Sequence, residues 1–304
     1  MVELIEEETL KSYLKAGESV KKAKKWIERL VKKDVKLKTI CEEVESLIVR
    51  SGCKPAFPCN ICINEIAAHY TPPANSNRLI PDNSLVKIDL GAHSNGFIAD
   101  TAITVNVSSE EDELITAVNE ALANVERELE PNIRVSKISS IIERTIKYYG
   151  FKPIVNLAGH QLKQYKLHTG FIIPNVRSIR NMFTRLTPGN AYAIEPFATT
   201  KKGKGEVIGR RGGNIYRLVS KRPPKMGFAR RIFLEIQRKY KTLPFTTRWL
   251  TDLRKKSHFQ RAFNHLVEKG YISEYPCMIE VNNQPVAQAE HTFVILEKEV
   301  ITIT

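Results

Sequence analysis

Several features that would assign a protein class at once are missing from this sequence. No apolar run approaches the roughly 20 residues that span a bilayer. The acidic N-terminus, MVELIEEETL, lacks the basic and then apolar pattern of a signal peptide. Cysteine is scarce, with five residues, and an odd number does not form a complete disulfide framework. We therefore expect a cytoplasmic protein with reduced thiols and no membrane association.

Common catalytic and ligand-binding motifs are also absent. The sequence contains no G-x-x-x-x-G-K-[ST] phosphate loop, no dinucleotide fingerprint, no G-x-S-x-G elbow and no H-E-x-x-H zinc motif. Cys59 and Cys62 form a C-x-x-C pair, but no second pair follows to complete a tetrahedral zinc site. We interpret this pair as structural.

What is present is an ordinary globular composition with an uneven charge. The chain has 304 residues, 42% hydrophobic and 26% charged, which is typical of a soluble protein of one or two domains. Residues 199–261 hold 19 Lys or Arg and three acids, so this segment accounts for the whole net charge of +14. A basic patch of this kind is typical of nucleic-acid binding, but also of a solvated surface, and both interpretations stay open.

Helical and strand patterns alternate along the chain. Residues 1–50 indicate two helices and residues 53–107 strands and turns; two further helices, the first capped by Ser109 and the second closed by Gly150, precede more strands. The apolar positions of the first helix are compatible with one amphipathic helix: Leu10, Leu14, Trp26, Ile27, Leu30 and Val31. Helix, helix and strands, twice over, predict an α/β (α+β) fold of two pseudo-repeated halves.

The pattern changes after Pro223-Pro224. Three helical segments follow up to Gly270, and strand character then returns. We predict a catalytic domain of residues 1–221 and 276–304, interrupted by a basic helical subdomain of residues 222–275.

Two aspartates stand out in the segment LVKIDLGAHSNGFIADTAITVNV. Apolar runs flank the turn-like GAHSNG, which predicts a β-hairpin. If Ser94 and Asn95 form the turn, Asp89 and Asp100 are direct cross-strand partners on one face. Like charges opposite each other are destabilising, so a metal ion between them is one interpretation, and solvent-facing aspartates are the other.

Further candidates lie in apolar surroundings. Glu195 (AYAIEPFA) and Glu290 (VAQAEHTF) would be costly to bury as lone charges, and His160 follows a glycine in NLAGHQL. Together with Asp89 and Asp100 they carry four negative charges, which two divalent cations would balance. Oxygen ligands with one imidazole suit Mn, Fe(II), Co or Zn.

The remaining histidines are ambiguous on their own. His69 (INEIAAHYTPP) and His168 (YKLHTGF) could be catalytic or structural. His93, beside the hairpin turn, is expected to be exposed, as are His258 and His265.

Six segments resemble the type 2 methionine aminopeptidases, in family order and over nearly the whole chain: CNICINEIAAHYTPP, VKIDLGAHSNGFIADTAITV, NLAGHQLKQYKLHTG, AYAIEPFAT, TLPFTTRWL and AQAEHTF. The resemblance implies the pita-bread fold, with two pseudo-symmetric halves of helices on an antiparallel sheet, a winged-helix-like insertion and a dinuclear metal site. The short N-terminus suggests an archaeal form, and the family suggests a monomer.

The resemblance also implies roles for individual residues. Asp89 would bind one metal, Asp100 and Glu290 would bridge two, and His160 and Glu195 would complete the second site. His69 and His168 would contact the substrate, and Phe57 and Phe197 would line a methionine pocket. A hydroxide bridging the metals would attack the first peptide bond of nascent polypeptides, with Glu195 as general base and a small second residue preferred.

Two other functions remain to be weighed. A proline-specific aminopeptidase or prolidase of the same fold shares the five ligands but usually lacks the helical insertion. A non-catalytic relative would bind RNA or the ribosome through basic residues 199–261, which could also serve as a second role of an enzyme.

Overall fold

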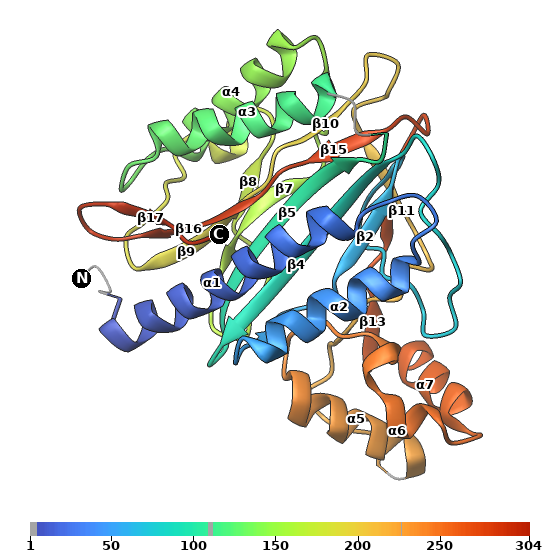
Figure 1. Ribbon diagram of the computed structural model, residues 1–304. Coiled ribbons are helices and arrows are strands. Elements are labelled where there is room, and N and C mark those ends of the chain that lie inside the picture. The colour runs from blue at the N-terminus through green and yellow to red at the C-terminus, as the bar shows by residue number, and fades with distance from the viewer. Residues whose placement is uncertain (1–4, 109–111, 226) are drawn as a thin grey trace.

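The computed structural model describes residues 5–108, 112–225 and 227–304, and two similar halves are visible in it (Figure 1). Each half begins with a pair of helices and continues into antiparallel strands. The elements of the first half are α1 (Glu7–Leu30), α2 (Leu37–Arg50), β1 (Lys54–Pro55), β2 (Asn60–Ile63), β3 (Ile66–Ala68), β4 (Leu85–Ser94) and β5 (Phe97–Asn106). Those of the second half are α3 (Glu113–Glu128), α4 (Val135–Tyr148), β6 (Lys152–Pro153), β7 (Ala158–Leu162), β8 (Ile172–Pro174), η1 (Ile179–Asn181), β9 (Asn190–Ile194) and β10 (Phe197–Thr199).

The C-terminal third adds strands to both halves and contains the insertion. Its elements are β11 (Val207–Arg210), β12 (Tyr216–Leu218), α5 (Gly227–Tyr240), η2 (Thr247–Trp249), α6 (Thr251–Arg254), α7 (Phe259–Glu268), β13 (Ile272–Glu274), β14 (Cys277–Glu280), β15 (Val286–Gln288), β16 (His291–Ile295) and β17 (Val300–Thr302). Strands β16 and β17 join the second half, in the order β17-β16-β9-β7-β8. In the first half, β4 pairs with β1, β2 and β5.

The two halves meet where β5 faces β16. A bridge between Ala102 and Glu290 joins them, and Thr292 Oγ1 donates to the carbonyl of Asp100 at 2.8 Å. Helix α1 lies over β4 and β5, and α2 packs beside it against β1 and β2, while α3 and α4 cover the second half (Figure 1). This arrangement confirms the predicted fold of two helix-and-sheet halves.

Helix α1 contacts the sheet through small residues. Its buried face includes Ala16, Val20 and Ala23, and a Cβ at Gly17 would lie 2.0 Å from the carbonyl oxygen of Ile303. Two of the apolar positions assigned to this amphipathic helix, Leu14 and Trp26, are 42% and 47% exposed and so lie off its buried face. Close approach of the helix to the C-terminal segment requires a residue without a side chain at Gly17, while the larger Tyr13 and Ile27 are buried elsewhere along the helix.

The other helix boundaries follow local sequence signals. Helix α2 ends before Gly52, and α4 before Gly150, both with positive φ as C-terminal glycines often have. The predicted cap Ser109 lies outside the described residues. The N-cap of α3 is Asp112, whose Oδ1 accepts a hydrogen bond from Leu114 N at 2.9 Å.

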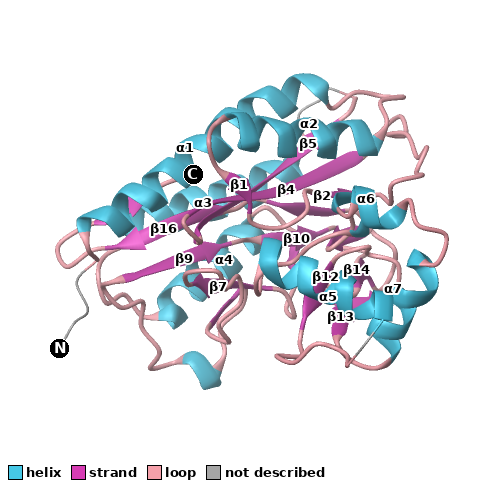
Figure 2. Cartoon of the chain, turned by 90° about the horizontal axis from the view of Figure 1, so that it is seen from below, coloured by secondary structure: helices cyan, strands magenta, loops and turns pink. Residues whose placement is uncertain are grey.

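The insertion has an apolar core of its own, and Figure 2 shows its helices α5, α6 and α7 gathered beside β12 and β13. Ile232, Phe233, Phe245 and Phe263 are buried in this core. Because β12 pairs with β13 and packs against the same core, we propose that the subdomain begins at β12 rather than at residue 222.

Two further observations concern the whole chain. None of the described helices is long and apolar enough to cross a membrane. The five cysteines are buried and unpaired, so Cys59 and Cys62 form no disulfide.

Candidate metal centre and its pocket

The β4–β5 hairpin places two carboxylates on one face. Asn95 and Gly96 form the turn, both with positive φ, as a two-residue type I′ turn requires. Asp89 therefore lies opposite Ala102, and Asp100 opposite Gly91. The predicted direct pairing of Asp89 with Asp100 is wrong because the turn lies one residue later, but both side chains still share a face as diagonal neighbours.

Three other segments bring further ligands to this face. His160 lies on β7, opposite Ala193. Glu195 follows β9, where Pro196 interrupts the strand before β10 begins. Glu290 lies between β15 and β16, and its backbone N–H donates to Ala102 O at 3.1 Å, which holds it beside Asp100.

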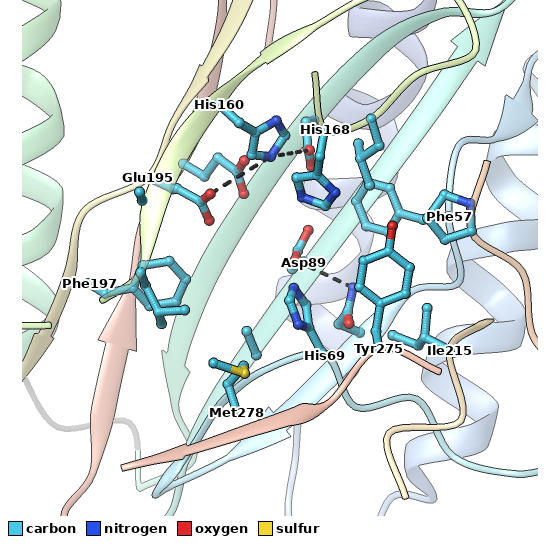
Figure 3. A pocket seen from close by; sticks show the side chains of 18 of the residues that line it. Phe57, His69, Asp89, His160, His168, Glu195, Phe197, Ile215, Tyr275 and Met278 are labelled. Atoms are coloured by element: carbon cyan, nitrogen blue, oxygen red, sulfur yellow. Dashed lines mark hydrogen bonds and ion pairs between the residues drawn. The ribbon is translucent and has the colours of Figure 1, made fainter. Parts of the chain in front are cut away.

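Figure 3 shows Asp89, His160 and Glu195 around one space. Atoms of Asp100, His160 and Glu290 all fall within 4.8 Å of one another. His160 Nε2 is 3.7 Å from Asp100 Oδ2 and 3.8 Å from Glu195 Oε1. Asp89 lines the same pocket, so the five predicted ligand side chains converge on one place.

Burial and mutual repulsion govern the protonation of this cluster. Burial raises the pKa of Asp89 to about 7. The pKa values of Asp100, Glu195 and Glu290 are raised well above their ordinary values, by burial first and then by neighbouring carboxylates. Burial lowers the pKa of His160 to about 4. A cluster of acceptors that repel one another in this way favours a bound cation.

Unpartnered acceptor atoms in the cluster also fit bound divalent metal ions. Asp89 Oδ1 and Asp100 Oδ1 are buried and find no hydrogen-bond partner among the described residues. Such orphaned acceptors are costly unless a ligand contacts them. Carboxylate oxygens with one neutral imidazole are the donor set that Mn, Fe(II), Co or Zn accept.

Two side-chain amides, which the sequence analysis did not identify, donate hydrogen bonds to carboxylates of the cluster. Gln288 Nε2 donates to Glu195 Oε2 at 3.3 Å and to Glu290 Oε2 at 3.4 Å. Asn60 Nδ2 donates to Asp89 Oδ2 at 3.4 Å. Both amide side chains are buried, and they orient the carboxylates as outer-shell partners of metal ligands do.

A pocket of about 320 Å³ opens over the cluster and has apolar walls. Phe57 and Phe197, the two candidates for a methionine pocket, line it together with Leu157 and Met278. The Phe57 ring lies against Gly91, where an added Cβ would be 2.3 Å from Phe57 Cε1. The glycine opposite Asp100 thus leaves room for one wall of the pocket.

His69 and His168 stand at the same pocket. His69 has a φ of +63°, which is uncommon for a residue with a side chain, and its Nδ1 donates to Pro276 O at 3.3 Å. Nε2 of the neutral ring is then an acceptor. The His168 ring lies 4.4 Å from that of His160. Burial lowers the pKa of both His69 and His168, so both are neutral near pH 7.

Tyr275 is a pocket residue that the sequence did not reveal. Its ring centroid lies 5.5 Å from that of His69 and 5.9 Å from that of His168. Ile215 and Pro244 line the same side. All three come from the insertion or its flanks, and no local signal connects them with histidines more than forty residues away.

The remaining histidines lie elsewhere. His258 and His265 are exposed, as predicted. The prediction that His93 is exposed is wrong: it is 7% exposed, its Nδ1 accepts from Gly96 N at 3.1 Å, and its ring packs on Tyr165.

Comparisons with known proteins identify relatives of the whole chain. Residues 11–297 match the model of metallopeptidase family M24. Methionine aminopeptidases of Thermococcus onnurineus and Thermococcus kodakarensis are each 45% identical over 291 residues, 96% of this chain and 97% of theirs. A thermophilic Arx1 structure superposes with a TM-score of 0.83 at 19% identity, covering 98% of this chain and 91% of its own. A methionine aminopeptidase structure of Thermotoga maritima has a TM-score of 0.72 at 19% identity and covers 100% and 99% of the two chains.

Proposed function

This chain belongs to metallopeptidase family M24, and from that membership we propose how its pocket removes an N-terminal methionine. The pita-bread fold, predicted from the resemblance, is confirmed by the structural matches. The archaeal relatives, 45% identical over nearly the full length, support a metal-dependent hydrolase that releases methionine. The carrying observation is the convergence of buried carboxylates and one imidazole on an apolar pocket.

Five residues would hold two divalent ions: Asp89, Asp100, His160, Glu195 and Glu290. As the resemblance implies, Asp100 and Glu290 would contribute to both ions; their donor atoms and that of His160 lie within 4.8 Å of one another. When bound, such ions lower the pKa of a water molecule and polarise the peptide carbonyl.

The chain's own side chains would position the substrate and move protons. Glu195 would accept a proton from the attacking water and pass it to the leaving amine, with its carboxylate oriented by Gln288. His168, neutral and beside His160, would donate a hydrogen bond where negative charge develops on the carbonyl oxygen. Nε2 of His69 would accept a hydrogen bond from the substrate.

Specificity would follow from the shape of the pocket. Phe57 and Phe197 would contact the methionine side chain, whose burial between apolar walls is favourable. The free α-amine would sit at the carboxylate cluster, which restricts cleavage to the first peptide bond. Tyr275, His69 and His168 crowd the opposite side, so a small second residue would be preferred.

Release of methionine from defined peptides tests this proposal. Chelator-treated protein would be supplied with Mn, Co, Fe(II) or Zn in turn and offered Met-Gly-Ser and Xaa-Pro peptides. We expect metal-dependent release of methionine from Met-Gly-Ser alone, and loss of this release in Glu195→Ala. A Phe197→Leu variant, which changes the pocket wall and no metal ligand, should still bind metal in calorimetry. Cleavage of only the Xaa-Pro peptides would transfer the chain to the proline-specific peptidases, which the sequence relatives do not favour.

A second role rests on the basic segment 199–261. Its net charge of +16 would attract ribosomal RNA and bring the enzyme to nascent chains. The enzyme would act there as a cytoplasmic monomer. Ribosome co-sedimentation should fall when lysines and arginines of the segment are neutralised, and should fall steeply with salt. Unchanged co-sedimentation would contradict this role without affecting the peptidase assay.

A further inference from the structure

A second cavity lies between the first half of the catalytic body and the insertion. It measures about 600 Å³, a size common for small-molecule sites. Helix α2 and strand β1 form one wall, and the end of α5 with η2 forms the other, where α2 stands above the insertion in Figure 1. Within the described part of the chain it shares no lining residue with the metal pocket. It therefore has no part in the proposed peptidase chemistry.

Positive charge dominates this cavity. Arg50, Lys54, Arg238 and Lys239 line it, against a single lining carboxylate, Glu45. That carboxylate is already neutralised by Arg248, whose Nη1 and Nη2 lie 2.5 and 2.8 Å from its two oxygens.

The four cationic side chains differ in whether an acidic side chain pairs with them. Arg238 and Lys239 share Glu235, at 3.0 and 2.9 Å. Arg50 reaches Glu43 only at 3.8 Å, and Lys54 has no acidic side chain within ion-pair distance among the described residues. Lys54 also contributes, after burial, to the lowered pKa of His93 in the cavity wall. Arg50 and Lys54 are therefore the cations available to an anion.

Two aromatic rings line the same cavity. Tyr240 stacks on Phe245 with an interplanar angle of 6°, and its ring centroid lies 5.4 Å from that of Trp249. Trp249 Nε1 donates to Glu45 Oε2 at 2.8 Å, which fixes the indole. Rings held in this way form a platform for another flat group at little entropic cost.

We propose that this cavity binds a phosphorylated nucleoside unit. Its base lies on Trp249 and Tyr240, and its phosphate is bound by Arg50 and Lys54. Stacking on fixed aromatic rings beside cations is the usual physics of sequence-tolerant nucleotide binding, and Arg can add bidentate contacts to phosphate. The unit comes either from a free nucleotide or from a single-stranded RNA segment, because both present the same base and phosphate.

The chain itself provides a reporter for the test. It has two tryptophans, so a Trp26→Phe variant leaves Trp249 as the fluorescent residue. Titration of this variant with ATP, AMP or a short oligouridylate should quench its emission saturably, and the quenching should weaken with salt. Saturation by AMP or ATP identifies a free nucleotide as the source, whereas saturation by the oligonucleotide alone identifies RNA. Absence of saturable quenching by every one of these ligands would overturn the proposal.

Charge-neutralising variants supply the matched comparison, both built on Trp26→Phe. Arg50→Gln/Lys54→Gln should weaken binding about tenfold or more, whereas Arg144→Gln/Lys147→Gln, on the distant helix α4, should change it by less than about twofold. Inorganic phosphate should compete only weakly. Equal loss in both double variants, or competition by phosphate as strong as by AMP, would overturn the proposal. Methionine release should be the same in all variants, which separates this site from the peptidase.

Discussion

The acidic residues at the metal centre lie in surroundings that disfavour their charged form. Burial raises the pKa values of Asp89, Asp100, Glu195 and Glu290. Neighbouring carboxylates raise those of Asp100, Glu195 and Glu290 further, whereas the hydrogen bond with Asp100 lowers that of Asp89. Lys24, whose Nζ donates to Thr101 Oγ1 at 3.4 Å, partly offsets the charge of Glu290. The metal-free cluster is therefore a source of instability that cations relieve.

The substitution Asp100→Asn should separate stability from metal binding. Removing one carboxylate lowers the repulsion, so the metal-free variant should be stabilised by about 1 kcal/mol, a Tm rise of roughly 2–4 °C. Affinity for Mn should fall at least about a hundredfold, because a direct ligand is lost. Thermal denaturation and calorimetry, with and without chelator, measure both. The exposed Asp82→Asn is the matched control, and a Tm decrease in metal-free Asp100→Asn would contradict the prediction.

Gly91→Ala should narrow the methionine pocket without touching the metal ligands. The new Cβ would lie 2.3 Å from Phe57 Cε1, so the ring must move. We expect kcat/KM for Met-Gly-Ser to fall about tenfold, with a loss of about 1–3 kcal/mol in stability from overpacking. Adding Phe57→Ala should relieve the clash and restore part of the stability, but not the activity. Unchanged kinetics in Gly91→Ala would show that Phe57 does not contact the substrate.

At the scale of elements, the β4–β5 hairpin is the framework of the site. Its two-residue turn determines which residues of the two strands oppose each other, and the bridge to Glu290 carries that register to the second half. His93 belongs to this turn, because its Nδ1 accepts the N–H of Gly96. Burial, and then Lys54 and Lys241, lowers the pKa of His93 to about 4.

The hairpin should therefore be sensitive to acid. The unfolded chain takes up a proton at His93 near pH 6.5, whereas the folded chain does so only near pH 4, so stability is lost as the pH falls through this window. The loss is up to about 3 kcal/mol. His93→Asn keeps an acceptor for Gly96 and should show a flatter profile in urea denaturation between these pH values. Parallel profiles of variant and parent would contradict the prediction.

At the scale of the whole molecule, one buried ion pair joins the insertion to the catalytic body. Arg248 contacts both oxygens of Glu45 on α2, and Nη2 also donates to Thr71 Oγ1 at 3.2 Å. Burial alone would lower the pKa of Arg248, but the hydrogen bond and charge of Glu45 raise it above its ordinary value. This contact positions the segment that contributes Pro244 and Tyr275 to the pocket.

Breaking this pair from one side should be costly. Arg248→Met leaves the buried Glu45 carboxylate without its cationic partner, and we expect a loss of about 3–5 kcal/mol in denaturant unfolding. Glu45→Gln added to Arg248→Met should recover much of that loss. Arg238→Met, which breaks an exposed pair with Glu235, should cost less than about 1 kcal/mol. Equal costs for the two arginine variants would show that Arg248 has no special role at the junction.

Local sequence was sufficient for much of this protein. The ends of α2 and α4 follow from single glycines, the hairpin from its turn residues, and the helix pairs from their apolar spacing. Glu195 and Glu290 could be chosen as candidate metal ligands from the sequence, because a charged side chain inside an apolar run needs a partner. Each of these signals acts over a few residues, so each can be read without knowledge of the rest of the chain.

Only the tertiary structure decided the features that depend on distant contacts. The exposure of Leu14 and the burial of His93 depend on how closely helix, strand and loop approach, whereas the turn at Asn95-Gly96 follows a local type I′ signal that the prediction did not use. Gln288 reaches Glu195 across 93 residues, and Arg248 reaches Glu45 across 203. Packing and desolvation act between side chains that adjoin in space whatever their separation in sequence, so no local pattern encodes them.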